Sequence, residues 1–178
     1  MNKSINPLKT LLFCFFINIY MPGATANTGL YISLSPAMVE VNTENASTQP
    51  TLIDFSLGYE FDNHQLELSL MTSLSDDSLN QLVVDVPSVN SVFYRYLPYK
   101  DTSVKIHLIL GVSQVEVESS YPNVPVSTET FDGASFGIGF EESFTSIPKL
   151  KLKLDVLRLY NGDNLDINLL SLGFSYAF

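Results

Sequence analysis

Charged side chains alternate with leucines near the end of this chain. Lysine occupies positions 149, 151 and 153 and aspartate position 155, with leucine at each position between them. The side chains of an extended strand point alternately to its two faces, so the charges share one face and the leucines the other. Charges in such a row can pair with opposite charges from other segments, or they can line a path for ions.

We predict that this row joins charges from other strands inside the fold. The predicted set consists of Glu60, Glu67, Arg95, Lys105, Glu141, Lys151, Lys153 and Asp155. Two hypotheses are open for it: a gate that rearranges to pass ions, and a static network whose members compensate one another. We prefer the static network, because an unpaired buried charge is costly.

A second group of charges is acidic and falls in segments that we expect to be loops. Its members are Glu44, Asp76, Asp77, Asp85, Glu118, Glu129 and Asp163. Carboxylates suit hard divalent cations, but no D-x-D-x-D-G spacing defines a site. We therefore expect a solvated acidic surface, with no metal site and no cofactor.

Eight segments have the period-two alternation of strands, and helical spacing is hard to find after Asn27. The predicted strands are 29–41, 51–61, 65–75, 88–97, 104–112, 132–144, 149–160 and 165–178. Tight turns at 62–64, 98–102 and 145–148 alternate with longer polar connections at 42–50, 76–87 and 119–130. Asn161-Gly162, a hairpin signal, is the one short connection where a long one was due. Such a meander is typical of an up-and-down barrel in an outer membrane.

The strand faces indicate which side meets lipid. The last strand places Leu170, Leu172, Phe174, Tyr176 and Phe178 on one face and small residues on the other. A lipid-facing lysine costs about 2–4 kcal/mol near the membrane midplane, so we expect the charged faces to point inward. A soluble barrel such as a lipocalin would exchange the faces. The glycines and serines on the charged faces favour the membrane barrel, because a narrow eight-stranded interior has little room for bulk.

Aromatic residues end every strand that is expected to run toward the periplasm. They are Tyr59, Phe61, Tyr94, Tyr96, Phe140, Phe144, Tyr176 and Phe178. Aromatic rings are favoured at the membrane interface, so their placement supports the same orientation.

Residues 1–26 have the features of a secretory signal peptide. The first nine residues contain Lys3 and Lys9 and no acidic residue, and a mostly apolar run, 11–21, follows them. Ala24-Thr25-Ala26 is an A-x-A cleavage site. The sole cysteine, Cys14, lies in this segment, so we expect no disulfide. The remaining domain, residues 27–178, has 7 basic and 19 acidic residues, a balance that disfavours binding to nucleic-acid phosphates.

Together, the signal, the eight strands and the final Gly-Phe-Ser-Tyr-Ala-Phe resemble the small outer-membrane barrels of the OmpA and OmpX type. The resemblance implies an all-β, eight-stranded antiparallel up-and-down transmembrane barrel in the bacterial outer membrane. It implies lipid and lipopolysaccharide as surroundings and a monomeric state. It also implies that the barrel assembly machinery, helped by periplasmic chaperones, reads Phe174, Tyr176 and Phe178.

Function is expected to be structural or a cell-surface interaction. Side chains fill the interior of an eight-stranded barrel, so a wide pore is excluded and a narrow gated channel is the alternative. A lipid A-modifying enzyme would require a histidine near a serine and a carboxylate at the outer rim. Asp76-Asp77-Ser78 lies in an outer loop, but His64 lies in a turn at the other end and His107 points inward. We therefore expect no catalytic residue.

Three local features do not follow the regular pattern. Pro36 predicts a bulge or an early end of the first strand, because proline lacks a ladder donor. The apolar phase changes beyond Ser113 to Val115 and Val117, which predicts that the fifth strand bulges or leaves the membrane there. Glu142 and Arg158 fall on the lipid faces, close to strand ends where water or headgroups can reach them.

Overall fold

The computed structural model describes residues 29–44, 46–99, 104–162 and 164–178, and its regular elements are strands. They are β1 (Gly29–Thr43), β2 (Ser47–Thr48), β3 (Thr51–Phe61), β4 (His64–Ser75), β5 (Asp77–Leu79), β6 (Leu82–Tyr96), β7 (Val104–Ser120), β8 (Ser127–Phe144), β9 (Ile147–Asn161) and β10 (Leu165–Ala177). Within these ranges no helix is long and apolar enough to span a membrane. The predicted signal peptide, with Ala24 and Ala26, lies outside the described residues.

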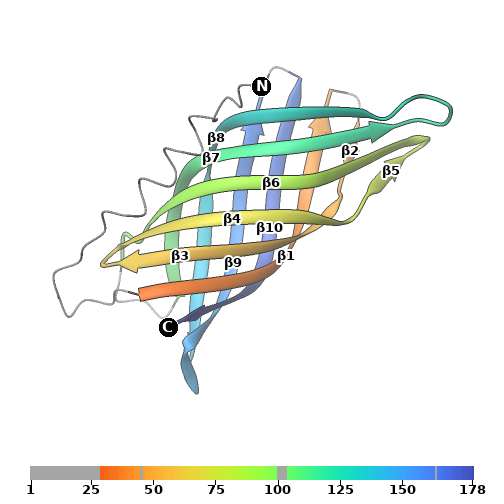
Figure 1. The fold of residues 1–178 in the computed structure, drawn as a ribbon. Coiled ribbons are helices and arrows are strands. Elements are labelled where there is room, and N and C mark those ends of the chain that lie inside the picture. The colour runs from red at the N-terminus through yellow and green to blue at the C-terminus, as the bar shows by residue number, and fades with distance from the viewer. Residues whose placement is uncertain (1–28, 45, 100–103, 163) are drawn as a thin grey trace, which may run out of the picture.

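The eight long strands form a closed antiparallel barrel, as predicted. Strands pair in the order β10-β9-β8-β7-β6-β4-β3-β1, and pairing of β10 with β1 closes the ring (Figure 1). Each long strand thus pairs with its neighbours in the chain. The short strands β2 and β5 are additional and lie in segments predicted as connections 42–50 and 76–87.

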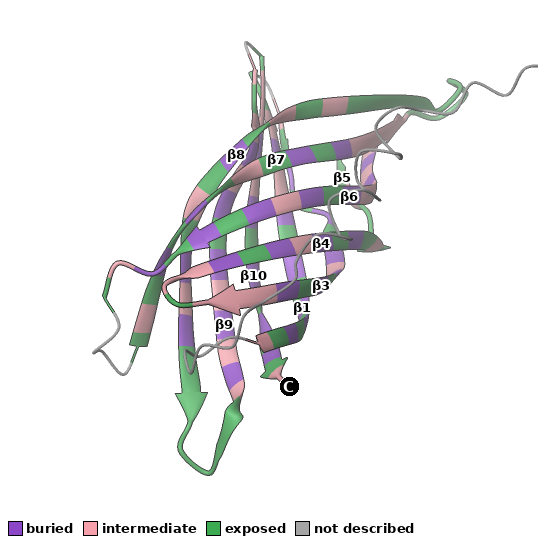
Figure 2. Cartoon of the chain, turned by 60° about the vertical axis from the view of Figure 1, so that its left-hand side comes forward, coloured by how far each residue is buried: buried purple, intermediate pink, exposed green. Residues whose placement is uncertain are grey.

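Burial alternates along the strands (Figure 2), and the exposed apolar residues form a belt around the barrel. On β7, Ile106, Leu108, Leu110 and Val112 are 45–61% exposed, whereas the intervening His107 is 1% exposed. The outward residues of β10 from Leu170 to Tyr176, and Phe178 after it, are similarly exposed. Nine residues at the rise and tilt of a barrel strand cover about 25 Å, the height of a membrane-facing band. The predicted outward direction of the apolar faces is confirmed in this part of the barrel.

Beyond the belt the two faces of the sheet exchange polarity. On β7, Gln114 and Glu116 point outward while Val115 is 0% exposed in the interior. The pairings of β7 with β6 and β8 pass through Ser113 and Val115 without a register shift, so of the two predicted alternatives the strand leaving the membrane fits better than a bulge at these residues. A register shift between β6 and β7 follows at Asp85 to Ser88, opposite Val117. The strand continues past the belt, where its polar outward residues meet water and its apolar inward residue Val115 packs in the core.

An apolar core fills the outer half of the interior. Its buried members are Ala37, Val39, Val41, Leu52, Met71, Val84, Val86, Val89, Phe93, Ile109, Val115, Leu157, Leu159, Ile167 and Leu169. They come from all eight long strands except β8, which contributes the half-buried Phe131 at the edge of the core. This part of the protein therefore resembles a soluble barrel, with apolar residues inside and polar residues outside.

Pro36 neither ends β1 nor causes a bulge, contrary to the prediction. The register of β1 with β3 is continuous through the pair Pro36↔Ile53. Pairing with β10 stops at Leu34↔Phe174 and resumes in the same register at Ala37↔Ser171. The barrel accommodates the missing donor by this gap on the β10 side.

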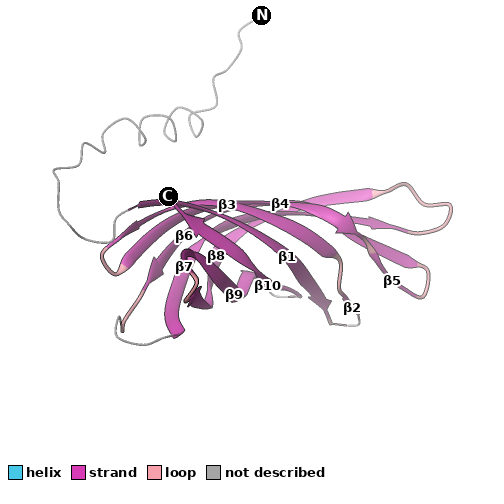
Figure 3. Ribbon diagram, turned by 90° about the horizontal axis from the view of Figure 1, so that it is seen from below, coloured by secondary structure: helices cyan, strands magenta, loops and turns pink. Residues whose placement is uncertain are grey.

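Two hairpins extend well past the core at the outer end. The segments 76–87 and 119–130, predicted as loops, are largely strand, because β6 begins at Leu82, β7 runs to Ser120 and β8 begins at Ser127. Figures 1 and 3 show the β5–β6 and β7–β8 tips projecting from the barrel. The long outer connections are therefore mainly a protruding sheet.

Candidate functional site

The predicted charges lie together on the inward faces of six strands, at the inner end of the barrel. β3 carries Glu60, β4 Glu67, β6 Arg95, β7 Lys105, β8 Glu141, and β9 Lys151, Lys153 and Asp155. Period-two alternation directs each side chain inward, and ring closure brings strands far apart in sequence face to face. We call these eight residues the lumenal network.

Arg95 lies at the centre of the lumenal network and is 0% exposed. Its Nη1 and Nη2 atoms donate to the two carboxylate oxygens of Asp155, each at 2.8 Å. Nη1 is also 3.5 Å from Glu67, and Nη2 is 3.8 Å from Glu141. The planar fork of arginine matches the carboxylate, so the geometry of the Asp155 pair is specific as well as strong.

Lys153 compensates the second buried carboxylate, Glu67. Its Nζ atom donates to both oxygens of Glu67, at 2.8 and 2.9 Å, and is 3.3 Å from Asp155. The Tyr31 hydroxyl donates to Glu67 at 2.8 Å. The Tyr31 ring occupies the space that a Cβ at Gly58 would fill, so the glycine allows the ring to lie close to the barrel wall.

A partly exposed layer lies below this pair, toward the inner opening. The Lys151 Nζ donates to Glu60 at 2.9 Å and to Glu141 at 3.3 Å. Lys105 Nζ is 4.0 Å from Glu60. The side chains of Lys105, Lys151 and Glu60 are 24%, 10% and 14% exposed, so water reaches this layer.

Two further polar residues belong to this interior and were missing from the predicted set. Asp54 is 3% exposed and accepts hydrogen bonds from Ser69 at 2.7 Å and from Ser56 at 3.0 Å. His107 is 1% exposed, with Nε2 3.5 Å from a carboxylate oxygen of Glu141. The period-two phase that Asp54 shares with Glu60 was the available signal. It places both carboxylates on the same face of β3.

The apolar core closes the interior above the lumenal network. Leu52, Leu159 and Ile167 each have 0% exposure. Buried serines also lie within this core and bond across strands: Ser113 to Ser91 at 2.7 Å and Ser135 to Ser113 at 2.6 Å. The charges therefore end in a dry, packed region and do not line a polar path through the barrel.

The outer end carries a rim of carboxylates. Above the belt, the described acidic residues are Glu40, Glu44, Asp76, Asp77, Asp85, Glu116, Glu118, Glu129, Asp132 and Asp166, and Arg158 is the sole described basic residue. The two charges predicted on lipid faces both lie near strand ends. Arg158 Nε donates to Asn168 at 3.2 Å toward the outer end, and Glu142 is exposed at the inner end. Predicted Asp163 lies outside the described residues.

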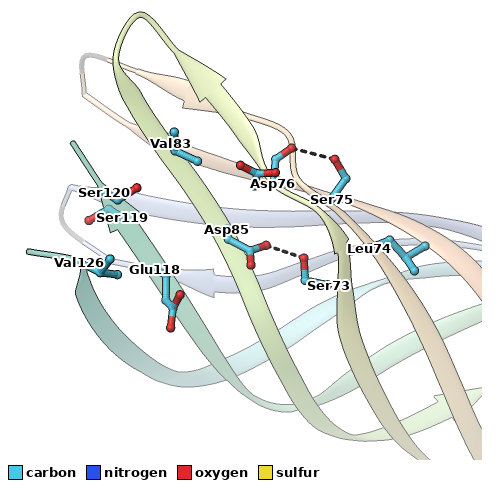
Figure 4. A pocket seen from close by; sticks show the side chains of 10 residues that line it. All are labelled: Ser73, Leu74, Ser75, Asp76, Val83, Asp85, Glu118, Ser119, Ser120 and Val126. Atoms are coloured by element: carbon cyan, nitrogen blue, oxygen red, sulfur yellow. Dashed lines mark hydrogen bonds between the residues drawn. The ribbon is translucent and has the colours of Figure 1, made fainter. Parts of the chain in front are cut away.

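A cavity of about 310 Å³ opens within this rim, with Asp76, Asp85 and Glu118 among its lining residues. Figure 4 shows Asp85 accepting a hydrogen bond from Ser73 and Ser75 bonding to the Asp76 backbone. In the part of the chain that the structure describes, no group of three or more His, Cys, Asp or Glu side chains could hold a metal ion.

Phe174 and Tyr176 lie on the outward face of β10, and Phe178 directly follows the strand, all within the apolar belt. Phe174, Tyr176 and Phe178 are 51%, 40% and 67% exposed. The Phe174 ring lies 6.2 Å from that of Phe144 on β8, and the Tyr176 and Phe178 rings are 5.6 Å apart. At the same end, His64 Nδ1 lies 2.6 Å from the Tyr94 hydroxyl, so His64 belongs to the interfacial aromatic cluster.

Comparisons with known proteins agree with this architecture. The family model for the outer membrane protein beta-barrel domain matches residues 10–178. No curated protein sequence matches the chain.

Three of the solved structures that match the chain illustrate the shared fold. Ail, the attachment invasion locus protein of Yersinia pestis, has a TM-score of 0.63 and 17% identity, and the match covers 85% of this chain and 99% of Ail. Neisserial surface protein A has a TM-score of 0.61 and 14% identity, covering 84% and 97%. The N-terminal barrel of Pseudomonas aeruginosa OprF has a TM-score of 0.55 and 12% identity, covering 84% and 100%.

Proposed function

Because the chain belongs to the outer membrane protein beta-barrel domain family, we propose that this outer-membrane barrel presents a protruding sheet for binding proteins at the cell surface. The membrane part anchors this sheet, and the lumenal network holds the anchor together. The observation that carries the proposal is an open strand edge at the outer end.

The open edge belongs to β8. Residues 127–132 pair with β7, from Ser127↔Ser119 to Asp132↔Gln114. On the other side, the pairing of β8 with β9 starts only at Phe136↔Arg158, so within the described residues this segment has a backbone partner on one side only. An exposed edge of this kind is a template on which an extended peptide can add as a further strand. We call residues 127–132 the β8 edge.

Charge indicates the chemistry of the partner. The outer surface has ten described carboxylates and the single described base Arg158. Like charges disfavour pairing of the β8 edge with a second copy of the chain, whereas an extended segment rich in lysine or arginine is attracted. We therefore propose a basic, extended partner segment.

The structural neighbours support a surface role in general but not a shared ligand. The crystal structure of Ail contains a heparin analogue, sucrose octasulfate, in complex with that protein. Sucrose octasulfate is polyanionic, and an acidic rim repels such a ligand. The proposal for this chain accordingly takes a partner of the opposite charge.

A peptide titration tests the proposal. The probe is a ten-residue peptide alternating lysine and threonine, added to the purified mature chain in nanodiscs at physiological salt. We expect saturable binding and slowed amide hydrogen exchange at residues 127–132, because a new strand would protect the free backbone groups of the edge. A peptide of equal charge with proline at alternate positions is the control, since it cannot pair as a strand.

Two variants separate the edge from the general charge of the surface. Thr128→Lys places a positive charge on the β8 edge, and Ser47→Lys places the same charge on the exposed residue of β2, which pairs with β1 and not with β8. We expect the first to weaken peptide binding more than the second. Equal effects, or binding of the proline peptide, would contradict edge pairing.

A narrow ion channel is the second candidate, and the apolar core argues against it. An ion entering from the lumenal network would have to pass side chains with no exposed surface, such as Leu52 and Leu159. Moving a charge into such surroundings without a partner is costly. The static network is therefore our proposal for the buried charges, and no residue is proposed as catalytic.

Biogenesis proposals follow from the family. We propose that residues 1–26 are removed by a signal peptidase that recognises Ala24 and Ala26. We also propose that the assembly machinery and chaperones recognise Phe174, Tyr176 and Phe178. The exposure of these three rings, on β10 and directly after it, supports recognition of this end of the chain. Lipopolysaccharide would surround the outer part of the belt, and the barrel would act as a monomer.

A further inference from the structure

A second cavity lies at the opposite end of the barrel from the acidic rim. It has a volume of about 350 Å³, and its lining includes Glu60, Lys105, Ser143, Lys149, Lys151 and Phe178. These residues come from the inner ends of β3, β7, β8 and β9 and from the end of the chain after β10. We call this cavity the inner mouth.

Positive charge is in excess in the inner mouth. Three lysine ammonium groups line the mouth, whereas two carboxylate side chains contact them, Glu60 in the lining and Glu141 behind Lys151. Glu60 is already shared, at 2.9 Å from the Nζ of Lys151 and at 4.0 Å from that of Lys105. Lys149 has no ion-pair partner among the described residues and is exposed. An anion entering the mouth would therefore meet at least one uncompensated ammonium group.

The floor of the inner mouth is closed. Lys151 also contacts Glu141 at 3.3 Å, and above it Lys153, Arg95 and Asp155 compensate one another. The apolar core lies beyond these pairs. The mouth is thus a blind pocket open at the inner end, so a ligand would enter and leave on the same side.

We propose that the inner mouth binds a phosphate group presented from the periplasmic side. Lysine binds phosphate as a flexible point charge. The lining residues include three lysines and no arginine, the residue that favours planar bidentate binding of carboxylates. Ser143 can add a hydroxyl donor from the lining. The volume lies in the range of small-molecule sites. The phosphate belongs either to a soluble phosphorylated compound or to a phospholipid headgroup at the inner interface, where Phe178 lies.

Titrations of the mature chain in uncharged detergent micelles test the site. The probes are inorganic phosphate, glycerol 3-phosphate and short-chain phosphatidylglycerol, followed by NMR of reductively methylated lysines, which keep their charge. We expect saturable shifts of the Lys105, Lys149 and Lys151 signals, with little change for Lys153, because Glu67 already holds that buried ammonium. Binding of glycerol 3-phosphate identifies a soluble source, and binding of the lipid alone identifies a headgroup.

Lys149→Gln and Arg158→Gln form a matched pair, since each removes one positive charge, at the inner and outer ends respectively. We expect Lys149→Gln to weaken binding of the effective probe about five- to tenfold, the loss of one charge-assisted contact, and Arg158→Gln to leave it unchanged. Migration before and after boiling on a gel verifies that both variants are folded. Failure of all three probes to saturate, or equal weakening by the two variants, would overturn the proposal.

Discussion

Arg95 illustrates how a single buried charge can be kept in this barrel. It has no exposed surface, and three carboxylates surround it, with Asp155 bound through both terminal nitrogens and Glu67 and Glu141 within 4 Å. Desolvation of a guanidinium is tolerated only when its donors and charge are matched in this way. Removing one member leaves the others buried without compensation.

Substitution of Arg95 tests this interpretation at the residue scale. We expect Arg95→Met to lower the free energy of unfolding by about 3–5 kcal/mol, because Asp155, Glu67 and Glu141 would be left with too few positive partners. The measurement is a urea titration in detergent micelles. Unfolding is monitored by circular dichroism, because the chain has no tryptophan for fluorescence.

The matched control is Arg158→Met, in which a partly exposed arginine with a 4.0 Å contact to Asp166 is removed. We expect this change to cost no more than about 1 kcal/mol, the usual range for surface pairs. Comparable losses in the two variants would show that the buried pairs do not stabilise the barrel more than surface pairs do.

At the scale of the element, β7 passes between two different surroundings without a register shift at the boundary. β7 faces lipid through Leu108 and Val112 and then water through Gln114 and Glu116, while its register to both neighbours stays regular from Leu108 to Glu116. The strand ladder depends on backbone hydrogen bonds, so it is indifferent to this exchange of side-chain polarity. On β7, the boundary of the membrane part is therefore marked by the change from apolar to polar outward side chains.

Two lysine substitutions on the outward face of β7 locate that boundary. We expect Leu108→Lys to destabilise the folded barrel by about 2–4 kcal/mol, because the charge would lie in the middle of the belt. We expect Gln114→Lys to be nearly neutral, because position 114 meets water. Equilibrium folding into lipid vesicles measures both changes, and a large cost at position 114 would move the boundary outward.

The whole molecule combines three zones along its axis. A charged and partly hydrated interior lies at the inner end, a dry apolar interior lies above it, and an acidic protruding sheet forms the outer end. The middle zone separates the other two. Ligands at either end would therefore act independently, and the interior would not connect the two sides of the membrane.

Recordings in planar bilayers test this separation. We expect the refolded chain to produce no discrete current steps, because ions would have to cross the packed apolar core. Lys151→Ala should behave identically, since the seal lies above Lys151. Current steps in the native chain that change in Lys151→Ala would instead support a gate formed by the lumenal network.

The sequence by itself determined the strands of the membrane part and the direction of their faces. Local alternation was enough, because adjacent side chains in an extended strand point to opposite faces. Where one face meets lipid, the leucine takes that face and the neighbouring lysine must point inward. For this reason positions such as Leu108, Lys151 and Lys153 were oriented correctly from sequence alone. Inside the barrel, however, alternation does not say which opposite charges meet.

Tertiary structure alone decided the partners and the limits of the membrane zone. Lys153 meets Glu67, 86 positions away, only because ring closure and register bring β9 opposite β4. Leu157 and Leu159 continue the inward phase of Lys153, yet their dry packing depends on apolar residues from the other strands. The protruding hairpins were likewise predicted as loops from the sequence. Their strands lie outside the membrane and are polar on both faces, so they lack the alternation of apolar and polar residues by which a strand is recognised.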